Sequence, residues 1–282
     1  MKQRKSLDWN FTVEASTYTI LAIAVIFTSF PILWGLTTSF KPLDQINVFP
    51  PTLFPKPVVF DSYIKVLFRS NFKVYLFNSI FMTGFTVLVS TALASHAGYA
   101  LARFKIPHRK NIMFALLMMG MVPIVALLIP LYLLSVQTGL YNTRLVILLI
   151  YVAWRTPIMT WILYGFFSQA PIEIEEAARI DGCTPVATFY KIMLPISQSG
   201  LVSSALLSAV FVWNDFLIAF TFTTKENLRM VSVGLYNYIT QYGIIWGELM
   251  AAAIVSIIPM IVLFILMQRK FVSGLASGAV KG

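Results

Sequence analysis

The stretch PIEIEEAARIDGCTPVATFYKIMLP, residues 171–195, is a polar segment between two long apolar runs. Its opening proline suits a first helical turn, and the glutamates after it place negative charge at the positive end of a helix dipole. Glu175 and Arg179 are four residues apart, in the favourable order for an ion pair on a solvated helix face. Two adjacent alanines, Ala177 and Ala178, would let a partner backbone approach closely. We therefore predict a short helix at the start of this segment.

A sharp turn and a second helix are predicted to follow. Gly182 comes directly after Asp181, where the first helix should stop, because a left-handed residue is needed at that position. Thr184 and Pro185 then suit the cap and the first turn of a second helix, which we expect to end at Pro195. From these residues alone, a plain connecting loop with two surface helices explains the segment equally well.

Composition shows what surrounds this segment. The chain has 282 residues, of which 58% are hydrophobic and only 11% are charged. A soluble domain carries about a quarter charged residues, so an ordinary soluble enzyme is excluded. The net charge of +10 does not indicate nucleic acid, because the basic residues lie in short flanks between apolar runs. One cysteine and two well-separated histidines offer no ligand set for a metal, and none is expected.

Six apolar runs are long enough to cross a bilayer. A hydrocarbon core of about 30 Å needs about 20 helical residues at about 1.5 Å each. Five uncharged runs of 20 to 33 residues, and a sixth that contains only Arg155, meet this length. We therefore predict an all-α integral membrane protein with six transmembrane helices in a single domain, residues 1–282. The approximate spans are 15–40, 74–102, 111–137, 145–168, 196–224 and 247–268, followed by a tail at 269–282.

Lysine and arginine counts give the predicted orientation, since cytoplasmic flanks carry an excess of both. With both termini inside, 12 of these residues lie in cytoplasmic segments and eight lie outside. The clusters closest to span ends, Arg103–Lys110 and Arg269–Lys270, favour the same topology. We therefore expect both termini and residues 171–195 on the cytoplasmic side of the membrane.

The polar segment resembles the signature loop of the permeases of ABC importers. That signature reads Glu-Ala-Ala, three residues, Gly, nine residues, Ile, one residue, Leu-Pro, and all seven positions are met in register. In that family the first helix of the loop docks into a groove of a separate cytoplasmic ATPase and transmits its closure. By this resemblance, the ATPase-coupling residues are Glu176, Ala177, Ala178, Asp181, Gly182, Ile192, Leu194 and Pro195.

Further resemblance covers nearly the whole chain and is to maltose-type sugar permeases, specifically the shorter of their two membrane subunits. It rests on Phe77-Asn78-Ser79 and Tyr99-Ala100-Leu101-Ala102-Arg103 in the second span, Trp213-Asn214-Asp215 in the fifth, and the tail Gln268–Gly282. In the maltose system this tail reaches toward the interface between two ATPase subunits. The resemblance implies that role for Gly274, Gly278 and Ala279, whereas the residues alone favour a frayed terminus.

The resemblance also implies a set of partners. In that family the chain pairs with a second, non-identical permease, two cytoplasmic ABC ATPase subunits and an extracytoplasmic solute-binding protein, in the lipid bilayer of a bacterial cytoplasmic (inner) membrane. The complex would import a sugar or a related polyol, driven by ATP hydrolysis in the ATPase. The sequence contains no G-x-x-x-x-G-K-[ST] phosphate loop. We therefore expect no catalytic residue and no cofactor in this chain, with ATP and Mg bound by the ATPase.

Two charges fall clearly inside predicted spans, Arg155 in the fourth and Asp215 in the fifth. A charge at the bilayer centre costs about 3 kcal/mol or more, so each should face the bundle interior or a cavity. Their similar depth suggests the hypothesis that they pair. Alternatively, Arg155 meets solvent in the translocation pathway, and Asp215 is a structural acceptor beside Asn214. All three are candidate pathway or gate residues.

Prolines inside predicted spans are candidate sites of gating bends, because proline breaks helical hydrogen bonding. They are Pro123 and Pro130 in the third span and Pro157 in the fourth. The aromatic residues of the fourth span are better explained by lipid contact and packing than by a sugar-stacking role.

Three alternatives remain open. The first is an ABC permease for glycerol phosphate or another small solute. An ion-driven secondary transporter would need charged residues along a path and repeated halves, but only Arg155 and Asp215 are available. An integral membrane enzyme would need an acidic cluster near the interface, and the sole candidate, Glu173–Asp181, fits docking better than catalysis.

Overall fold

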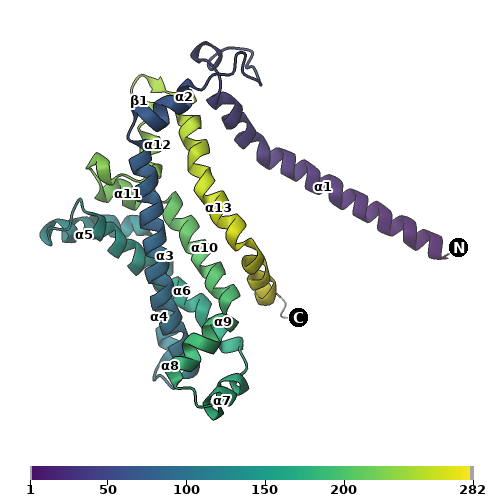
Figure 1. Cartoon of the computed structure of the whole chain (residues 1–282), viewed down its shortest axis with the longest axis vertical. Helices are drawn as coiled ribbons and strands as arrows, with labels where there is room; N and C mark the ends of the chain where they lie inside the picture. The colour runs from purple at the N-terminus through teal and green to yellow at the C-terminus, as the bar shows by residue number, and fades with distance from the viewer. Residues whose placement is uncertain (1, 280–282) are drawn as a thin grey trace. The chain divides into compact units, whose positions relative to one another are not determined.

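The structure, a computed structural model, describes residues 2–279, and it describes the side chains of residues 13–271. Within that range the regular elements are helices apart from one short hairpin, which confirms the predicted all-α fold (Figure 1). The long helices are α1 (Lys2–Ser39), α3 (Phe72–Arg103), α6 (Arg144–Gln169), α10 (Gln198–Asn214) and α13 (Trp246–Ala279). The shorter α-helices are α2 (Asp61–Ile64), α4 (Arg109–Met121), α5 (Ile124–Gln137), α7 (Ile172–Ile180), α8 (Pro185–Thr188), α9 (Leu194–Ile196), α11 (Leu217–Phe222) and α12 (Val231–Tyr236). Short 3-10 turns, η1 (Leu43–Gln45) and η4 (Glu226–Leu228), and π-helical turns, η2 (Lys65–Arg69) and η3 (Phe189–Met193), complete the set.

In the described part of the chain, four helices are long and apolar enough to cross a membrane on their own. They are α3, α6, Val13–Ser39 of α1 and Trp246–Phe271 of α13. Two bent pairs meet the same test only when each pair is counted as one span: α4 with α5, and Pro185–Ile196 with α10. On that basis the count reaches the six spans that the sequence predicts.

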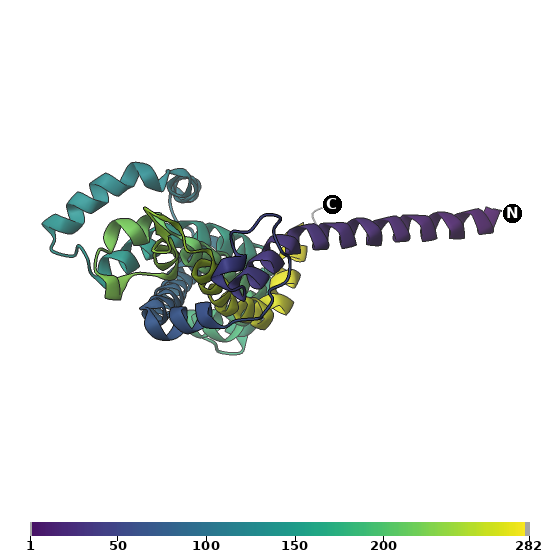
Figure 2. The same ribbon diagram turned by 90° about the horizontal axis from the view of Figure 1, so that it is seen from above.

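The predicted third span is a helix pair bent by 90°. In the view from above, α4 is seen end-on while α5 lies across the view (Figure 2). The break falls at Pro123, as predicted, because proline lacks an N–H group and pushes the preceding Val122 into the extended conformation that the structure shows. Pro130 and Pro157 lie inside α5 and α6, which continue through them, so neither ends its helix.

The predicted fifth span, 196–224, is not one continuous helix, which corrects the sequence prediction. α10 ends at Asn214, Asp215 is extended, and α11 starts at Leu217. The carboxylate of Asp215 accepts the backbone N–H groups of Ile218 and Ala219, at 3.0 and 3.2 Å, and so caps α11. A carboxylate at this position satisfies the free N–H groups of a new helix rather than continuing the old one.

Contacts divide the chain into two compact units. The first contains residues up to Ser70 together with Asn237–Val255. A half-buried ion pair within it joins Lys65 Nζ to Glu248 Oε1 at 3.2 Å. The antiparallel hairpin of β1 (Ile239–Thr240) and β2 (Gly243–Ile244), with Ile239 opposite Ile244, also belongs to this unit.

The second unit contains Asn71–Tyr236 and the rest of α13. Helices α3 and α6 run antiparallel in it, because Asn78 bonds to Arg144 at one end and Arg103 bonds to Ala170 at the other. Two buried apolar clusters lie along this pair. The cluster near the start of α6 includes Met82, Ile147, Tyr151, Val212, Ile218 and Phe222. The cluster near its end includes Ala94, Tyr99, Met159, Leu163, Phe167, Phe189 and Met193.

Candidate functional site

The turn that ends α7 has the geometry that the sequence predicts. Gly182 has a φ of +83°, in the left-handed region. Its N–H donates to the carbonyl of Arg179 at 3.0 Å, and the N–H of Cys183 donates to the carbonyl of Ala178 at 2.9 Å. These two bonds form a Schellman motif, which satisfies the last carbonyls of the helix and requires a residue that tolerates positive φ. The turn fixes the direction in which the chain leaves α7.

The predicted second helix also forms. The hydroxyl of Thr184 accepts the N–H of Ala187 at 3.2 Å, and α8 begins at Pro185. The chain then continues through η3 and α9 to Ile196, one residue beyond the predicted end at Pro195. Residues 171–195 are therefore two helical segments joined by a turn. We refer to them as the coupling segment.

The two faces of α7 differ from the sequence prediction. Glu175 and Ala178 are buried, whereas Glu176 and Ala177 are exposed and Ile180 is 86% exposed. Only one of the two adjacent alanines therefore faces outward. The face that another protein could contact combines a carboxylate, a small side chain and an isoleucine.

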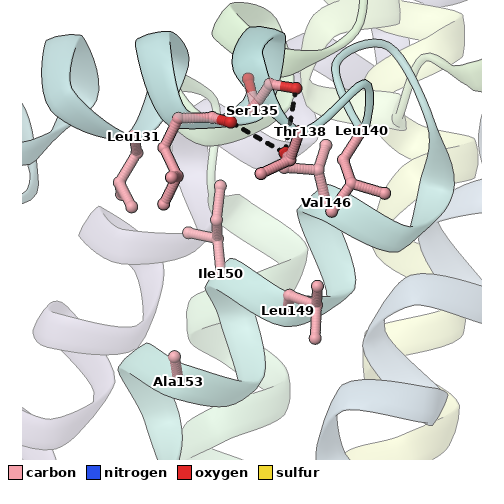
Figure 3. A pocket seen from close by; sticks show the side chains of 9 residues that line it. Leu131, Ser135, Thr138, Leu140, Val146, Leu149, Ile150 and Ala153 are labelled. Carbon is pink, nitrogen blue, oxygen red and sulfur yellow. Dashed lines mark hydrogen bonds between the residues drawn. The ribbon is translucent and has the colours of Figure 1, made fainter.

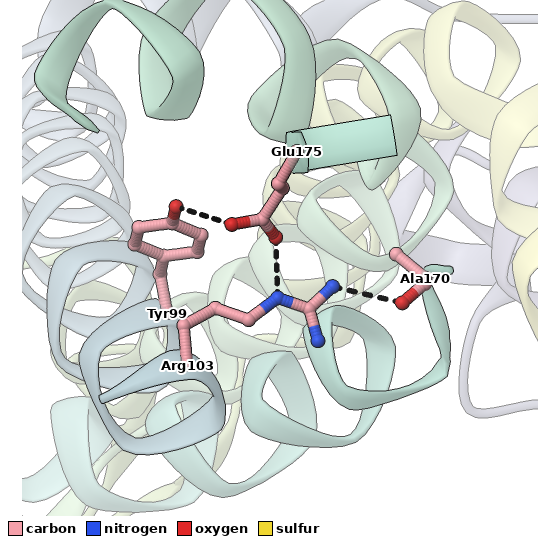
Figure 4. Close-up of polar contacts among 4 residues, drawn as sticks. All are labelled: Tyr99, Arg103, Ala170 and Glu175. Atoms are coloured by element: carbon pink, nitrogen blue, oxygen red, sulfur yellow. Dashed lines mark hydrogen bonds and ion pairs between the residues drawn. The ribbon is translucent and has the colours of Figure 1, made fainter. Parts of the chain in front are cut away.

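Glu175 does not pair with Arg179 on a solvated face, and this prediction was wrong. Its Oε1 forms an ion pair with Nε of Arg103, and its Oε2 accepts the hydroxyl proton of Tyr99 at 2.9 Å (Figure 4). Arg103 Nη2 also donates to the carbonyl of Ala170 at 2.8 Å. The spacing of Glu175 and Arg179 suits an ion pair in an isolated helix. In the folded chain, however, the side chain of Glu175 points toward the end of α3 instead.

The second half of the coupling segment is held by apolar packing. Phe189 is buried against Tyr99 and Phe167, with ring centroids 4.9 and 6.2 Å away. His96 of α3 lies 2.8 Å from the hydroxyl of Tyr190 through Nε2. Both halves of the segment are thus attached to α3.

The structure places the remaining predicted coupling residues on this segment as well. Asp181 and Pro195 are exposed, and Ile192 and Leu194 are half-buried. Helix α13 extends to Ala279, but the side chains of Gly274, Gly278 and Ala279 lie outside the residues whose side chains the structure describes.

Arg155 and Asp215 do not pair within the described side chains. Asp215 accepts the hydroxyl proton of Tyr151 at 2.9 Å in addition to its two backbone bonds, so it acts as a structural acceptor. The guanidinium of Arg155 lies 4.4 Å from the ring centre of Phe211. Asn214 donates to the carbonyl of Val210, four residues earlier in the same helix, at 2.8 Å.

A second polar cluster, at the opposite end of α3, was missed by reasoning from the residues. Asn78 is fully buried; it donates to the carbonyls of Asn227 and Arg229 at 2.8 and 3.0 Å and accepts from Arg144 at 3.0 Å. The hydroxyl of Ser79 accepts the N–H of Val231 at 2.8 Å. In the sequence only a resemblance points to the triplet Phe77-Asn78-Ser79, because its partners lie 66 to 152 residues away.

An apolar pocket of about 240 Å³ lies between α5 and α6 (Figure 3). Its lining residues include Leu131, Leu140, Val146, Leu149 and Ile150. The two hydroxyls in the lining are already used, since Ser135 donates to Tyr132 and Thr138 donates to Leu134. The lining therefore offers a sugar no free hydroxyl donor, and the pocket suits apolar groups better than a polar solute.

Comparisons with known proteins identify the family of this chain. Residues 94–277, which include the coupling segment, match the family model described as binding-protein-dependent transport system inner membrane component. The chain belongs to this family and is therefore a multi-pass component of an inner-membrane transport system.

Individual relatives cover nearly the whole chain. The trehalose/maltose transport system permease protein MalG of Thermococcus litoralis is 35% identical over 261 residues, 90% of this chain and 91% of that protein. The trehalose transport system permease protein SugB of Mycobacterium tuberculosis is 33% identical over 272 residues, 95% of this chain and 98% of that protein. A crystal structure of a bacterial ABC transporter involved in alginate import matches with a TM-score of 0.80 at 22% identity, over 93% of this chain and 97% of that one. The last match shows the ABC importer permease fold.

Proposed function

We propose that this chain is the shorter membrane subunit of a binding-protein-dependent ABC importer for a sugar or a related polyol. Its family supports the transport role, and two relatives that cover most of the chain are named for trehalose or maltose transport. The observation that carries the proposal is the coupling segment, whose short first helix has a buried face toward α3 and an exposed face for a partner. The partners would be a second permease, two ATPase subunits and an extracytoplasmic binding protein.

In the proposed mechanism, ATP-driven closure of the ATPase dimer moves α7, and the attached spans shift from inward-open to outward-open. The binding energy of ATP then changes the relative populations of two membrane conformations. This chain binds neither ATP nor Mg and catalyses no reaction in the scheme. Its own role is to receive the movement on the exposed face of α7, with the coupling segment and both termini in the cytoplasm.

Reversal of the exposed charge on α7 tests the docking role. Glu176→Lys should lower the amount of ATPase that co-purifies with the chain by at least about tenfold, because a like or unpaired charge at an interface costs more than the about 1.4 kcal/mol that corresponds to tenfold. Lys225→Glu, an exposed reversal at the opposite end of α6, is the matched control and should not change recovery. Full ATPase recovery with Glu176→Lys would contradict docking at this face.

A binding screen of the cognate binding protein with trehalose, maltose and glycerol phosphate would identify the solute class.

Substitution of Gly182 tests the turn. Gly182→Val should lower ATP-dependent uptake severalfold, because a β-branched residue at a φ of +83° strains the backbone by about 1–2 kcal/mol and redirects the chain. Open space surrounds the position, so strain rather than a clash is being measured. Gly182→Asn is the control, since asparagine tolerates left-handed backbone, and it should keep most of the uptake. Equal losses in both variants would show that the backbone conformation is not the cause.

A further inference from the structure

Helix α3 supplies both side chains that hold Glu175. Tyr99 and Arg103 are four residues apart and therefore lie on one face of the helix. Between them they engage both carboxylate oxygens of Glu175 (Figure 4). The side chains of Arg103 and Glu175 are only 10% and 4% exposed. The contact is thus an enclosed ion pair that joins α7 to the last turn of α3.

An enclosed ion pair resists separation more than apolar contact does. Removal of one partner from a buried pair is strongly destabilising, because the other charge stays buried without compensation. A movement that pulls α7 from α3 would separate these two charges and also break the bond from Tyr99 to Glu175. The last turn of α3 is therefore expected to follow α7 when α7 moves.

The opposite end of α3 is attached to a different segment. Tyr75 donates to Glu226 at 2.8 Å, and Asn78 and Ser79 hold the backbone between Asn227 and Val231. Asn142 fixes the start of the same segment, since its side-chain oxygen accepts the N–H groups of Thr224 and Lys225, each at 3.1 Å. Residues 224–231 thus form a loop bonded directly to the first turns of α3. We refer to them as the distal loop.

We propose that Glu175 is a positioning residue that links α7 to α3, and that α3 transmits the movement of the coupling segment to the distal loop. We refer to the contacts of Glu175 with Tyr99 and Arg103 as the tie. The proposal rests on the proposed function, in which an ATPase drives α7. It assigns a role to Tyr99, Arg103 and Glu175 that is separate from ATPase docking, because all three side chains face the inside of the bundle. Loss of the tie should therefore leave the ATPase bound but its movement untransmitted.

The test uses the whole complex in lipid vesicles. Cys183→Ser removes the native thiol, and Lys225→Cys places a single thiol on the distal loop, where the side chain is exposed. The rate of reaction with a membrane-impermeant maleimide is measured without nucleotide and with ATP bound to a non-hydrolysing ATPase. In this parent chain the two rates should differ by about threefold or more, since the two conformations differ in population.

Three variants of the tie are then compared. Glu175→Gln and Arg103→Gln should keep the co-purified ATPase but lose the rate difference. The double exchange Glu175→Arg with Arg103→Glu should restore at least part of it, because the pair can form again with its charges reversed. Lys65→Gln, which breaks the more accessible ion pair with Glu248, is the matched control and should keep the full difference.

The outcomes separate the two proposals. Failure of the ATPase to bind the parent chain would contradict the proposed function itself. Bound ATPase with an unchanged rate difference in Glu175→Gln and Arg103→Gln would overturn the tie. A parent chain whose distal loop does not respond to ATP would overturn transmission through α3. If a single variant fails to fold, the double exchange is the deciding measurement. A double exchange that does not restore any of the rate difference would contradict the proposal.

Discussion

Asp215→Ala is expected to lower the free energy of unfolding by about 2–4 kcal/mol, because it leaves three buried donors without an acceptor. These donors are the hydroxyl of Tyr151 and the N–H groups of Ile218 and Ala219. The only other acceptor near Tyr151 in the described structure is the sulfur of Met230, at 3.6 Å, which is a weak partner. The purified complex should show a lower midpoint in thermal or denaturant unfolding.

Two further variants show which bond matters. Asp215→Asn keeps an acceptor oxygen and should lose less than half as much stability. Tyr151→Phe removes the hydroxyl and its bond to Asp215, while the backbone N–H groups of Ile218 and Ala219 keep their acceptor. It should therefore lower the free energy of unfolding by about 1 kcal/mol. If Asp215→Asn were as damaging as Asp215→Ala, the charge rather than the capping geometry would be responsible, and the pairing of Asp215 with a cation would need to be reconsidered.

Residues that act on their immediate neighbours were predictable from sequence. Gly182 needs positive φ because of its place after α7, and Thr184 caps a helix that starts one residue later. Both features depend on fewer than ten residues of chain. Pro123 breaks the third span for the same local reason, since its effect on Val122 does not depend on the rest of the fold.

The helix face that packs inward was not predictable in this way. Glu175 could pair with Arg179 by its spacing, but its actual partners, Tyr99 and Arg103, lie 76 and 72 residues away. Only the packing of α7 against α3 decides between them. Asn78 gives a similar case, since its three bonds connect segments that the sequence separates by 66 to 151 residues.

Span counting located the apolar sequence but not its bends. A rule based on uncharged length treats 196–224 as one helix, whereas Asp215 ends α10 and caps α11. The same rule cannot distinguish Pro123, which breaks a helix, from Pro157, which α6 accommodates. Hydropathy fixes the amount of chain in the membrane, and side-chain hydrogen bonds then decide where each helix stops.

Gly98→Leu is expected to cause the largest loss of folded, functional protein. A Cβ atom at this position would lie 3.0 Å from the backbone nitrogen of Tyr164 and 3.2 Å from the carbonyl oxygen of Thr160. Both atoms belong to the backbone of α6 and cannot rotate away, so the two helices would have to separate. The cost should be about 3 kcal/mol or more, and uptake should fall at least about tenfold.

Gly84→Leu is the matched control, because Gly84 lies in the same helix and a Cβ there meets nothing within 4 Å. Leucine favours helix over glycine by close to 1 kcal/mol, so this variant should be neutral or slightly stabilising. The loss of stability and uptake in Gly98→Ala should lie between those of Gly98→Leu and Gly84→Leu, since alanine requires a smaller displacement of α6 than leucine does. Gly98 immediately precedes Tyr99, and any separation of α3 from α6 there would also displace the tie to Glu175. Variants at Gly98 should therefore lose ATP-driven uptake before they lose the bound ATPase, whereas loss of both together would indicate unfolding alone.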